Sequence, residues 1–373
     1  MRFLHTADWH LGRKLFGYDL LAEQQASFAQ VVKIAQAEQV DAVVIAGDLY
    51  DRQNPSEEAV RLLNQMISDL NLTLKQPLLV INGNHDSAVR LGVGSQWFEQ
   101  TGYYLRTTLN SVDHPIVIGD SQFFLLPYFE LYQARQFFDD ETIHTLAQAM
   151  TALVARMMAQ FDASKKHILV AHFFAAGSTH SDSETSINVG GLDAVPLNLL
   201  TDFDYVALGH IHNKDALHEP RVRYSGSLNK FSLSEVNQTK GVLIVDTEPE
   251  IKVRFCPITP LHEVQQLTGA FADLSDANYL QKHGIDQAAY TGIVLTDTNV
   301  ISNASNRLKQ QFPRFLTISR ANGVQFSQQR TLATTKQQTP QDLLADFYQT
   351  VTGQPLTDQQ VAWAAKALKE TEQ

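Results

Sequence analysis

Five short apolar runs, each ending in polar residues, constrain the fold of this chain more than any other feature. The runs are rich in Val, Ile and Leu without alternation, which is typical of strands buried on both faces. Segments with helical spacing lie between several of them, over residues 21–39, 56–70 and 141–161. The runs are RFLHTAD, VDAVVIAGD, QPLLVINGNHD, KKHILVAH and FDYVALGH. Strands that alternate with helices predict a layered α/β fold.

The helix predicted over residues 56–70 has a start signal of its own. It follows an Asn-Pro pair, in which Asn54 can cap the helix and Pro55 can occupy its first position.

The pattern changes after about Gly241. GVLIVDTE and IKVRFCPI are interpreted as closing strands, and CPITP, residues 256–260, as a domain boundary. YTGIVLTD, NASNRLKQQF and RFLTISRA then predict a small strand–helix–strand module. The expected domains are therefore residues 1–260, residues 261–335 and, beyond a Gln/Thr-rich linker, a tail over residues 340–373.

Two helical patterns separated by TGQP make up this tail, and each carries an apolar stripe. Thr357 or Asp358 can cap the second helix. The stripes consist of Leu343, Leu344, Phe347 and Val351 in the first helix, and of Val361, Ala364, Ala365 and Leu368 in the second. We expect such a stripe to pack on a partner, or else on this chain's own module.

The formal net charge of −11 excludes attraction of the whole molecule to nucleic acid, so DNA binding would need local basic groups, bound metals or a partner. The single cysteine, Cys256, has no partner for an internal disulfide. No apolar run approaches a membrane span, and there is no secretion signal, so we expect a soluble, cytoplasmic protein.

Polar side chains follow each of the five runs. They are Asp8 and His10, Asp48, Asn84 and His85, His172, and His210 and His212. Ligands in open α/β folds lie just beyond the carboxyl ends of strands. Residues two apart in an extended segment face the same way, so DWH and HIH can each direct two side chains into one cleft.

Other interpretations of these residues exist. A buried histidine is more often a hydrogen-bonded core residue than a ligand, which is how we interpret His5, His167 and His262. The pairs GD and GN are common in turns. Turns alone, however, explain poorly why polar signals end five apolar runs, so the set favours one site.

Imidazole, carboxylate and amide oxygen together suit Mn, Fe or Zn. The seven candidate ligands exceed what one ion with an open position needs, and they favour the two ions of a phosphoester-cleaving site. One ligand must then bridge the ions. A carboxylate with its two oxygens suits this best, and Asp48 is central in the order along the chain.

DWHLG, GDLYD, GNHD, AH and GHIH resemble, in this order, the motifs of the calcineurin-like metallophosphoesterases. DWHLGRKLFG, SDSETSINVGG and RYSGSLNKFSLSE resemble segments of the SbcD family of bacterial nuclease subunits within that superfamily. The resemblance covers the whole chain and is most specific over residues 1–245. It implies a layered β-sandwich core flanked by helices, a small α+β capping domain and a C-terminal helical tail.

The resemblance also implies a role for each polar residue. One metal would be held by Asp8, His10 and His212, and the other by Asn84, His172 and His210. Asp48 would bridge them, His85 would protonate the leaving oxygen, and Asp86 would orient His85. Archaeal and eukaryotic relatives commonly have histidine where this chain has Asp51, so that role does not transfer.

By the same resemblance, the chain would be a Mn-dependent DNA exonuclease with endonuclease action on single strands and hairpins, acting in DNA repair, recombination and replication. It would work as a homodimer within a heterotetramer with an SbcC-type coiled-coil ATPase, on which the tail docks. Two alternatives remain. A phosphomonoesterase of the same superfamily is disfavoured by the SbcD-like segments and the tail. A metal-bound scaffold without catalysis is disfavoured by the intact His85.

Basic residues near the motifs are candidate DNA contacts, although each is also interpretable as an ordinary surface charge. They are Arg13, Lys14, Arg52, Lys214, Arg221, Arg223 and Lys230. The Ser- and Gly-rich residues 177–191 are either a phosphate-contacting loop or an ordinary surface loop.

Overall fold

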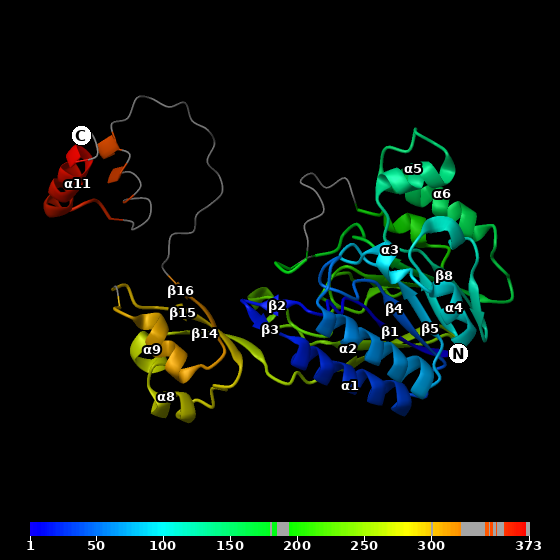
Figure 1. The fold of residues 1–373 in the computed structure, drawn as a ribbon, viewed down its shortest axis with the longest axis horizontal. Helices are drawn as coiled ribbons and strands as arrows, with labels where there is room; N and C mark the ends of the chain where they lie inside the picture. Colours follow the sequence, from blue (N-terminus) through cyan, green and yellow to red (C-terminus); the bar gives the residue numbers. More distant parts are fainter. Residues whose placement is uncertain are drawn as a thin grey trace. The chain divides into compact units, whose positions relative to one another are not determined.

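The computed structural model describes residues 1–179, 181–184, 194–299, 301–321, 340–342, 344–345, 348 and 354–370. The chain divides into two compact units, Met1–Val264 and Gln265–Gln373 (Figure 1). The first unit continues past the boundary expected after residue 260 because the segment beyond the last strand still bonds to it. The backbone N–H of Ile258 donates to the carbonyl of Lys240, and His262 Nδ1 lies 2.7 Å from a Glu23 oxygen.

A mixed six-stranded sheet forms one layer of the first unit. Its strands, in order across the sheet, are β13 (Lys252–Pro257), β12 (Gly241–Asp246), β1 (Arg2–Thr6), β4 (Ala42–Ala46), β5 (Leu78–Ile81) and β6 (Tyr103–Arg106). From β1 to β6 the strands are parallel, whereas β12 runs antiparallel to β1. The carboxyl ends of β1, β4 and β5 therefore meet at one edge.

A five-stranded sheet forms the second layer. Its order is β11 (Val222–Tyr224), β10 (Tyr205–Gly209), β9 (Lys166–His172), β8 (Ser121–Leu125) and β7 (Ile116–Ile118). All its pairs are parallel except that of the edge strand β7 with β8. The five predicted strands are confirmed as β1, β4, β5, β9 and β10, but two different sheets share them.

The two sheets pack face to face through a shared apolar core. Phe3 of the first sheet meets Phe123 and Tyr205 of the second edge-on, with ring centroids 5.3 and 5.8 Å apart. Helices α1 (Leu21–Ala37) and α2 (Glu57–Ser68) pack on the outer face of the first sheet. This sandwich buries both faces of each central strand, which explains why the runs lack alternation.

Helices α5 (Leu131–Phe138) and α6 (Leu146–Met158) pack on the outer face of the second sheet. The layered sandwich flanked by helices is thus confirmed (Figure 1). The remaining short elements of this unit are β2 (Lys14–Leu15), β3 (Tyr18–Asp19), η1 (Asp69–Thr73), α3 (Ala88–Leu91), α4 (Ser95–Phe98), η2 (Glu99–Thr101), η3 (Leu109–Ser111), η4 (Leu197–Leu200) and η5 (Leu233–Glu235).

The start predicted for the second helix is wrong. Ser56, not Asn54, is the N-cap of α2, because its extended backbone lets the hydroxyl accept a bond from the N–H of Ala59 at 3.3 Å. The Asn54 side chain instead accepts a hydrogen bond from Arg90. Pro55 therefore precedes the cap.

The second unit contains the small module that the sequence predicts. Its sheet has the order β14 (Val264–Gly269), β15 (Tyr290–Leu295) and β16 (Phe315–Arg320), with helices α7 (Phe271–Leu274), α8 (Ala277–Lys282) and α9 (Ala304–Gln311). The predicted strand–helix–strand is confirmed as β15, α9 and β16. Ile293, Leu308 and Phe312 are buried within the module, so it has a core of its own.

The last helix of the tail, α11 (Asp358–Glu370), is confirmed. Thr357 caps it, since the N–H of Gln360 donates to Thr357 Oγ1 at 3.4 Å while Gln360 Oε1 accepts from the N–H of Thr357. Val361 and Trp363 are 50% and 63% exposed. Leu343, Phe347, Val351, the linker, residues 185–191 and the side chain of Leu368 lie outside the described residues. Among the described helices, none is long and apolar enough to cross a membrane.

Candidate metal centre

Side chains from both sheets converge beyond the carboxyl ends of five strands. Asp8 and His10 follow β1, Asp48 follows β4, Asn84 follows β5, His172 ends β9, and His210 and His212 follow β10. All of these side chains except Asn84 are at least 95% buried. Burying so many titratable groups together is costly unless their charges are balanced and their polar atoms are hydrogen-bonded.

One group within this cluster consists of Asp8, His10 and His212, each of which offers a ligand atom within 4.8 Å of the others. The Nε2 atoms of His10 and His212 are 3.0 Å apart. A second group surrounds Asn84, whose Oδ1 lies 3.0 Å from His172 Nε2 and 3.1 Å from His210 Nδ1. The seven residues predicted as ligands are therefore close together. Asp8 also forms a group with Asp48 and His172, and His10 forms one with Asp51 and His85, so their division into two sets stays a prediction.

Asp48 lies between these two groups. Its Oδ2 is 3.5 Å from His10 Nε2 and 3.3 Å from His172 Nε2. Its Oδ1 accepts the backbone N–H of His85 at 2.9 Å, which fixes the orientation of the carboxylate. One oxygen thus faces a nitrogen from each group, as a bridging ligand requires.

Burial and neighbouring charges shift the pKa values of several groups in the centre. Burial raises the pKa of Asp8 well above its ordinary value. Burial acts on Asp48 in the same direction, but the nearby histidines, His172 first, outweigh it and lower the pKa of Asp48 below its usual range. Burial lowers the pKa of His172, but Asp48 outweighs it and raises that pKa to about 9. Burial lowers the pKa of His210 to about 3.

The donor set fits divalent metal ions. Imidazole nitrogens, carboxylate oxygens and one amide oxygen surround the centre, a combination that suits Mn, Fe or Zn. His10 Nδ1 is buried and has no hydrogen-bond partner, and the nearest acidic oxygen, Asp51 Oδ1, is 3.9 Å away. A carboxylate beyond the second ring nitrogen is the usual support of a metal-binding histidine.

His85 lies beside the ligand groups. Its ring meets that of His10 edge-on, with centroids 4.7 Å apart, and its Nδ1 is 2.9 Å from the backbone carbonyl of Asp51. Since a carbonyl only accepts, Nδ1 carries the hydrogen of this bond. Asp51, whose role the resemblance leaves open, therefore contributes its backbone here.

Asp86 holds the loops of the centre together. Its carboxylate accepts backbone N–H bonds from Leu49, Tyr50 and Gly83 at 2.9 to 3.1 Å. Burial raises the pKa of Asp86 to about 7, and the charge of Asp48 adds to this effect. That Asp86 orients the His85 ring stays a prediction, because these bonds position the backbone of the loop.

Several of the predicted ligands also form the turns at the strand ends. Asp8, His10, Asp48 and His210 have φ values of 53°, 44°, 51° and 96°, which non-glycine residues seldom adopt. At Gly83, a Cβ atom would lie 2.1 Å from Asp48 Oδ1, so only glycine allows the loop to approach that carboxylate. The Gly-Asn pair is therefore a turn that brings this loop close to Asp48.

The three histidines interpreted as structural have structural contacts. His5 is buried, with its ring nitrogens 3.0 Å from the Tyr205 hydroxyl and 3.2 Å from the Leu208 carbonyl. His167 stacks on Phe161, with ring centroids 3.7 Å apart. His262 pairs with Glu23 of α1.

Several of the predicted DNA contacts already have intramolecular partners. Arg13 donates to the carbonyl of Ser183 and to Asp51. Lys230 bonds to the carbonyl of Val236 and to Glu263.

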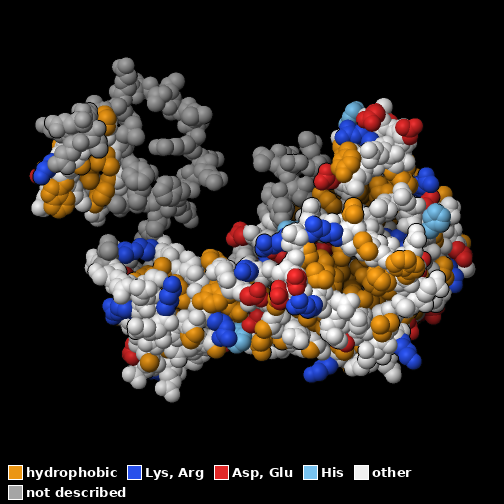
Figure 2. All heavy atoms as spheres, viewed as in Figure 1, with side chains coloured by type: hydrophobic (Ala, Val, Ile, Leu, Met, Phe, Trp, Pro, Cys, Tyr) orange, Lys and Arg blue, Asp and Glu red, His pale blue; other side chains and the backbone are white. Residues whose placement is uncertain are grey.

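The other basic candidates differ in their surroundings. Lys214 bonds to Asp215, and the Nε of Arg223 is buried. Lys14, Arg52 and Arg221 are exposed. Figure 2 shows basic and acidic side chains interspersed over the face that it displays.

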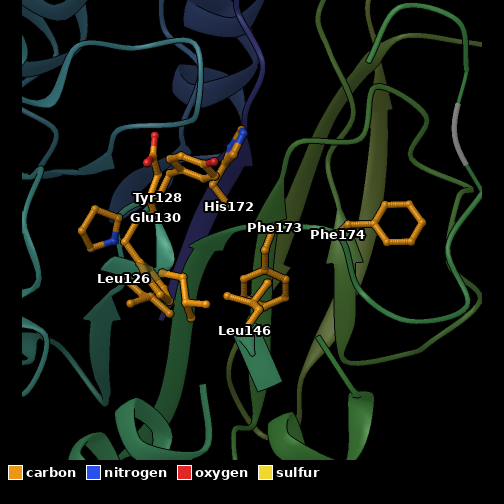
Figure 3. Close-up of a pocket in the computed structure, with 10 residues that line it drawn as sticks. Leu126, Tyr128, Glu130, Leu146, His172, Phe173 and Phe174 are labelled. Atoms are coloured by element: carbon orange, nitrogen blue, oxygen red, sulfur yellow. The ribbon is translucent and has the colours of Figure 1, made fainter. Parts of the chain in front are cut away.

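A pocket of about 350 Å³ adjoins the centre at His172 (Figure 3). The ring of Tyr128 stands edge-on to that of His172, with centroids 6.4 Å apart. The other lining side chains are mainly apolar, with Phe173 and Phe174 among them and Glu130 as the acidic member. The pocket is therefore mainly apolar and reaches the centre at His172.

Four residues that the sequence analysis did not single out surround His212. They are Ser183, Glu184, Glu235 and Lys240. A signal was present, since three of them lie in the segments SDSETSINVGG and RYSGSLNKFSLSE. Their pairing with His212 depends on the fold.

Comparison with known proteins agrees with this geometry. A family model described as calcineurin-like phosphoesterase matches residues 1–214, the class that the sandwich and its metal centre define. A second model, described as the type 5 capsule protein repressor C-terminal domain, matches residues 260–352. A dimetal phosphatase structure from Danio rerio has a TM-score of 0.42 at 14% identity, covering 70% of this chain and 99% of that chain, a likeness too weak to support an argument.

Two curated relatives are similar over almost their whole length. Both are named as the SbcD component of the nuclease SbcCD, one from Staphylococcus epidermidis and one from Staphylococcus saprophyticus. Each is 36% identical over 362 residues, covering 96% of both chains. This chain therefore belongs to the SbcD family of the calcineurin-like phosphoesterases.

Proposed function

We propose that this chain is a metal-dependent DNA nuclease subunit that degrades duplex ends and cuts single strands and hairpins. The observation that carries the proposal is the position of Asp48, whose Oδ2 faces nitrogens of both ligand groups, with His85 alongside. The names of the curated relatives support the reaction class.

The proposed centre holds two divalent ions, Mn first among them. One would be held by Asp8, His10 and His212 and the other by Asn84, His172 and His210, with Asp48 shared. Such ions supply charge compensation for the phosphoryl oxygens and lower the pKa of a water nucleophile.

The chain's own residues would handle the proton. His85 keeps its Nδ1 hydrogen on the Asp51 carbonyl, so the protonated imidazolium form would deliver its second proton, from Nε2, to the leaving sugar oxygen. Asp86 holds the backbone that carries His85 against that of Leu49 and Tyr50. Asp48 contributes to the same alignment by accepting the N–H of His85.

One observation favours a nucleic acid over a small phosphomonoester. Residues 265–321 carry five basic and four acidic side chains, so this module lacks the strong negative charge of the whole chain. We propose that the module caps the active site and helps to position DNA, together with exposed cations such as Lys14 and Arg52.

The proposed partner is an SbcC-type ATPase, because the relatives are named as components of an SbcCD nuclease. The exposed Val361 and Trp363 of α11 support docking through the tail. A homodimer within a heterotetramer and a cytoplasmic location, where ATP and chromosomal DNA are available, complete the proposal.

The test is to incubate the purified chain with labelled duplex DNA, hairpin DNA and p-nitrophenyl phosphate, with Mn²⁺ or with a chelator. We expect Mn²⁺-dependent cleavage of both DNAs and far slower release of p-nitrophenol. Preferential hydrolysis of the monoester would instead identify a phosphomonoesterase. Metal binding with no hydrolysis of any substrate, even after the SbcC-type ATPase and ATP are added, would identify a scaffold.

A further inference from the structure

A buried ion pair lies behind His212, and the proposed chemistry does not use it. Lys240 Nζ is 2.6 Å from Glu235 Oε2, and the two side chains are 6% and 0% exposed. Removing two charges from water is costly unless other bonds hold them in place.

Lys240 connects this pair to the backbone of His212. Its ammonium group donates to the carbonyl of His212 at 2.9 Å, to Ser227 Oγ at 3.0 Å and to Gln238 Oε1 at 2.8 Å. The N–H of Ser227 donates to the same His212 carbonyl. Gly226 makes this approach possible, because its φ is +75° and a Cβ there would lie 2.7 Å from the carbonyl oxygen.

The ring and the backbone N–H of His212 are held separately. Ser183 Oγ lies 2.7 Å from His212 Nδ1, and Glu235 Oε1 lies 3.9 Å from the same nitrogen. The backbone N–H of His212 donates to Glu184 Oε1 at 2.8 Å. If the hydrogen is on Nδ1 and donated to Ser183 Oγ, the lone pair is on Nε2, which lies 3.0 Å from His10 Nε2.

We propose that Ser183, Glu235 and Lys240 form a positioning network that fixes His212, and that it sets the affinity of the metal position formed by Asp8, His10 and His212. The inference rests on the two-ion centre of the proposed function. Under this inference, residues of the segment RYSGSLNKFSLSE hold the metal ligand His212 in place. In the other metal position, Asn84 Oδ1 lies 3.0 Å from His172 Nε2 and 3.1 Å from His210 Nδ1, and neither contact involves a member of this network.

A role in folding alone makes a different prediction. If these residues only stabilised the unit, their loss would lower the melting temperature of the metal-free protein and weaken both metal positions together. A positioning network instead separates the two positions, because only one of them contains His212.

The experiment titrates metal-free, full-length protein with Mn²⁺ and counts bound ions by calorimetry and by the electron paramagnetic resonance of free Mn²⁺. The variants are Ser183→Ala, which removes the Nδ1 partner, and the double variant Glu235→Gln with Lys240→Met, which leaves no unpaired charge. Ser183→Thr keeps a hydroxyl. The matched control is Ser121→Ala, which removes a buried hydroxyl bonded to Asp120 on the second sheet.

We expect two Mn²⁺ positions in the wild type. In Ser183→Ala and in the double variant, one position should weaken about 10- to 100-fold, the usual effect of losing support behind a metal ligand. Ser183→Thr should restore most of that affinity, and Ser121→Ala should leave both positions unchanged.

Two results would overturn the inference while leaving the proposed function intact. One is unchanged affinity at both positions in Ser183→Ala and in the double variant. The other is equal weakening at both positions accompanied by a lower metal-free melting temperature. A wild type that binds fewer than two Mn²⁺ would overturn the two-ion centre itself, and the inference with it.

Discussion

At the scale of single residues, the candidate site depends most on Asp48, because one of its oxygens faces both ligand groups. We predict that Asp48→Ala abolishes DNA cleavage. It should also lower the affinity for both ions by more than the roughly 10- to 100-fold expected for a supporting residue. The metal content of desalted protein, measured by elemental analysis, checks this. Two tightly held ions in the variant would exclude a bridging role.

His85 should behave differently, since it lies beside the ligand groups and its Nδ1 bonds to a carbonyl. We predict that His85→Ala keeps both ions and DNA binding but loses about 10²- to 10⁴-fold in cleavage rate, the usual contribution of a general acid. His114→Ala is the control, because His114 is exposed and pairs with Asp113 away from the centre. Loss of metal with an unchanged rate per bound ion would identify His85 as a ligand.

At the scale of elements, the cap of α2 offers a direct comparison of the sequence-based and structural assignments. Ser56→Ala should lower the free energy of unfolding by about 1 kcal/mol, because the N–H of Ala59 loses its partner. Asn54→Ala should change it by less than about 0.5 kcal/mol, since its bond to Arg90 is exposed. Urea unfolding monitored by circular dichroism measures both, and the opposite ranking would restore Asn54 as the cap.

The strands that support the site could be predicted because burial on both faces produces continuous apolar runs. Their division between two sheets could not, because pairing partners are far apart in sequence: β1 pairs with β12 across more than 200 residues. The strands β6, β7, β8 and β11 and the helix α5 were also missed. All are short, and β8 was missed although it is fully buried, because its run is brief and follows a polar turn.

The candidate ligands could be identified because each follows a strand and because metal ions restrict the residue types. The support behind His212 could not be identified in this way. A serine, a glutamate and a lysine have no common spacing, and their roles appear only when Gly226 brings the loop against the His212 carbonyl. The Asp51 carbonyl beside His85 was also hidden, since a backbone atom leaves no signature in residue type.

At the scale of the whole molecule, the two units allow the capping role to be tested. A chain ending after Glu263 keeps the His262–Glu23 and Glu263–Lys230 pairs and the cores of the first unit. We predict that it folds and retains both ions but degrades duplex DNA at least about tenfold more slowly, a loss of about 1.4 kcal/mol of transition-state stabilisation. Undiminished duplex degradation would exclude the capping role.

The tail should be separable from catalysis. We predict that a chain ending after residue 338 retains nuclease activity but no longer co-purifies with the SbcC-type ATPase, because it lacks α11 with its exposed Val361 and Trp363. Co-expression and affinity purification measure this. Undiminished co-purification would show that docking lies elsewhere on the chain.

The strand order also governs when during synthesis the enzyme becomes active. Under the proposed assignment, the first metal position needs Asp8 together with His212. Strand β1 lies between β4 and β12, and β12 is formed by residues 241–246. A nascent chain on the ribosome therefore lacks the predicted ligands that follow the strands of the second sheet until those strands have been translated. Under this assignment, unfinished chains and fragments from one side of the sandwich would lack a complete first metal position, and we expect them to leave the genome that encodes them uncut.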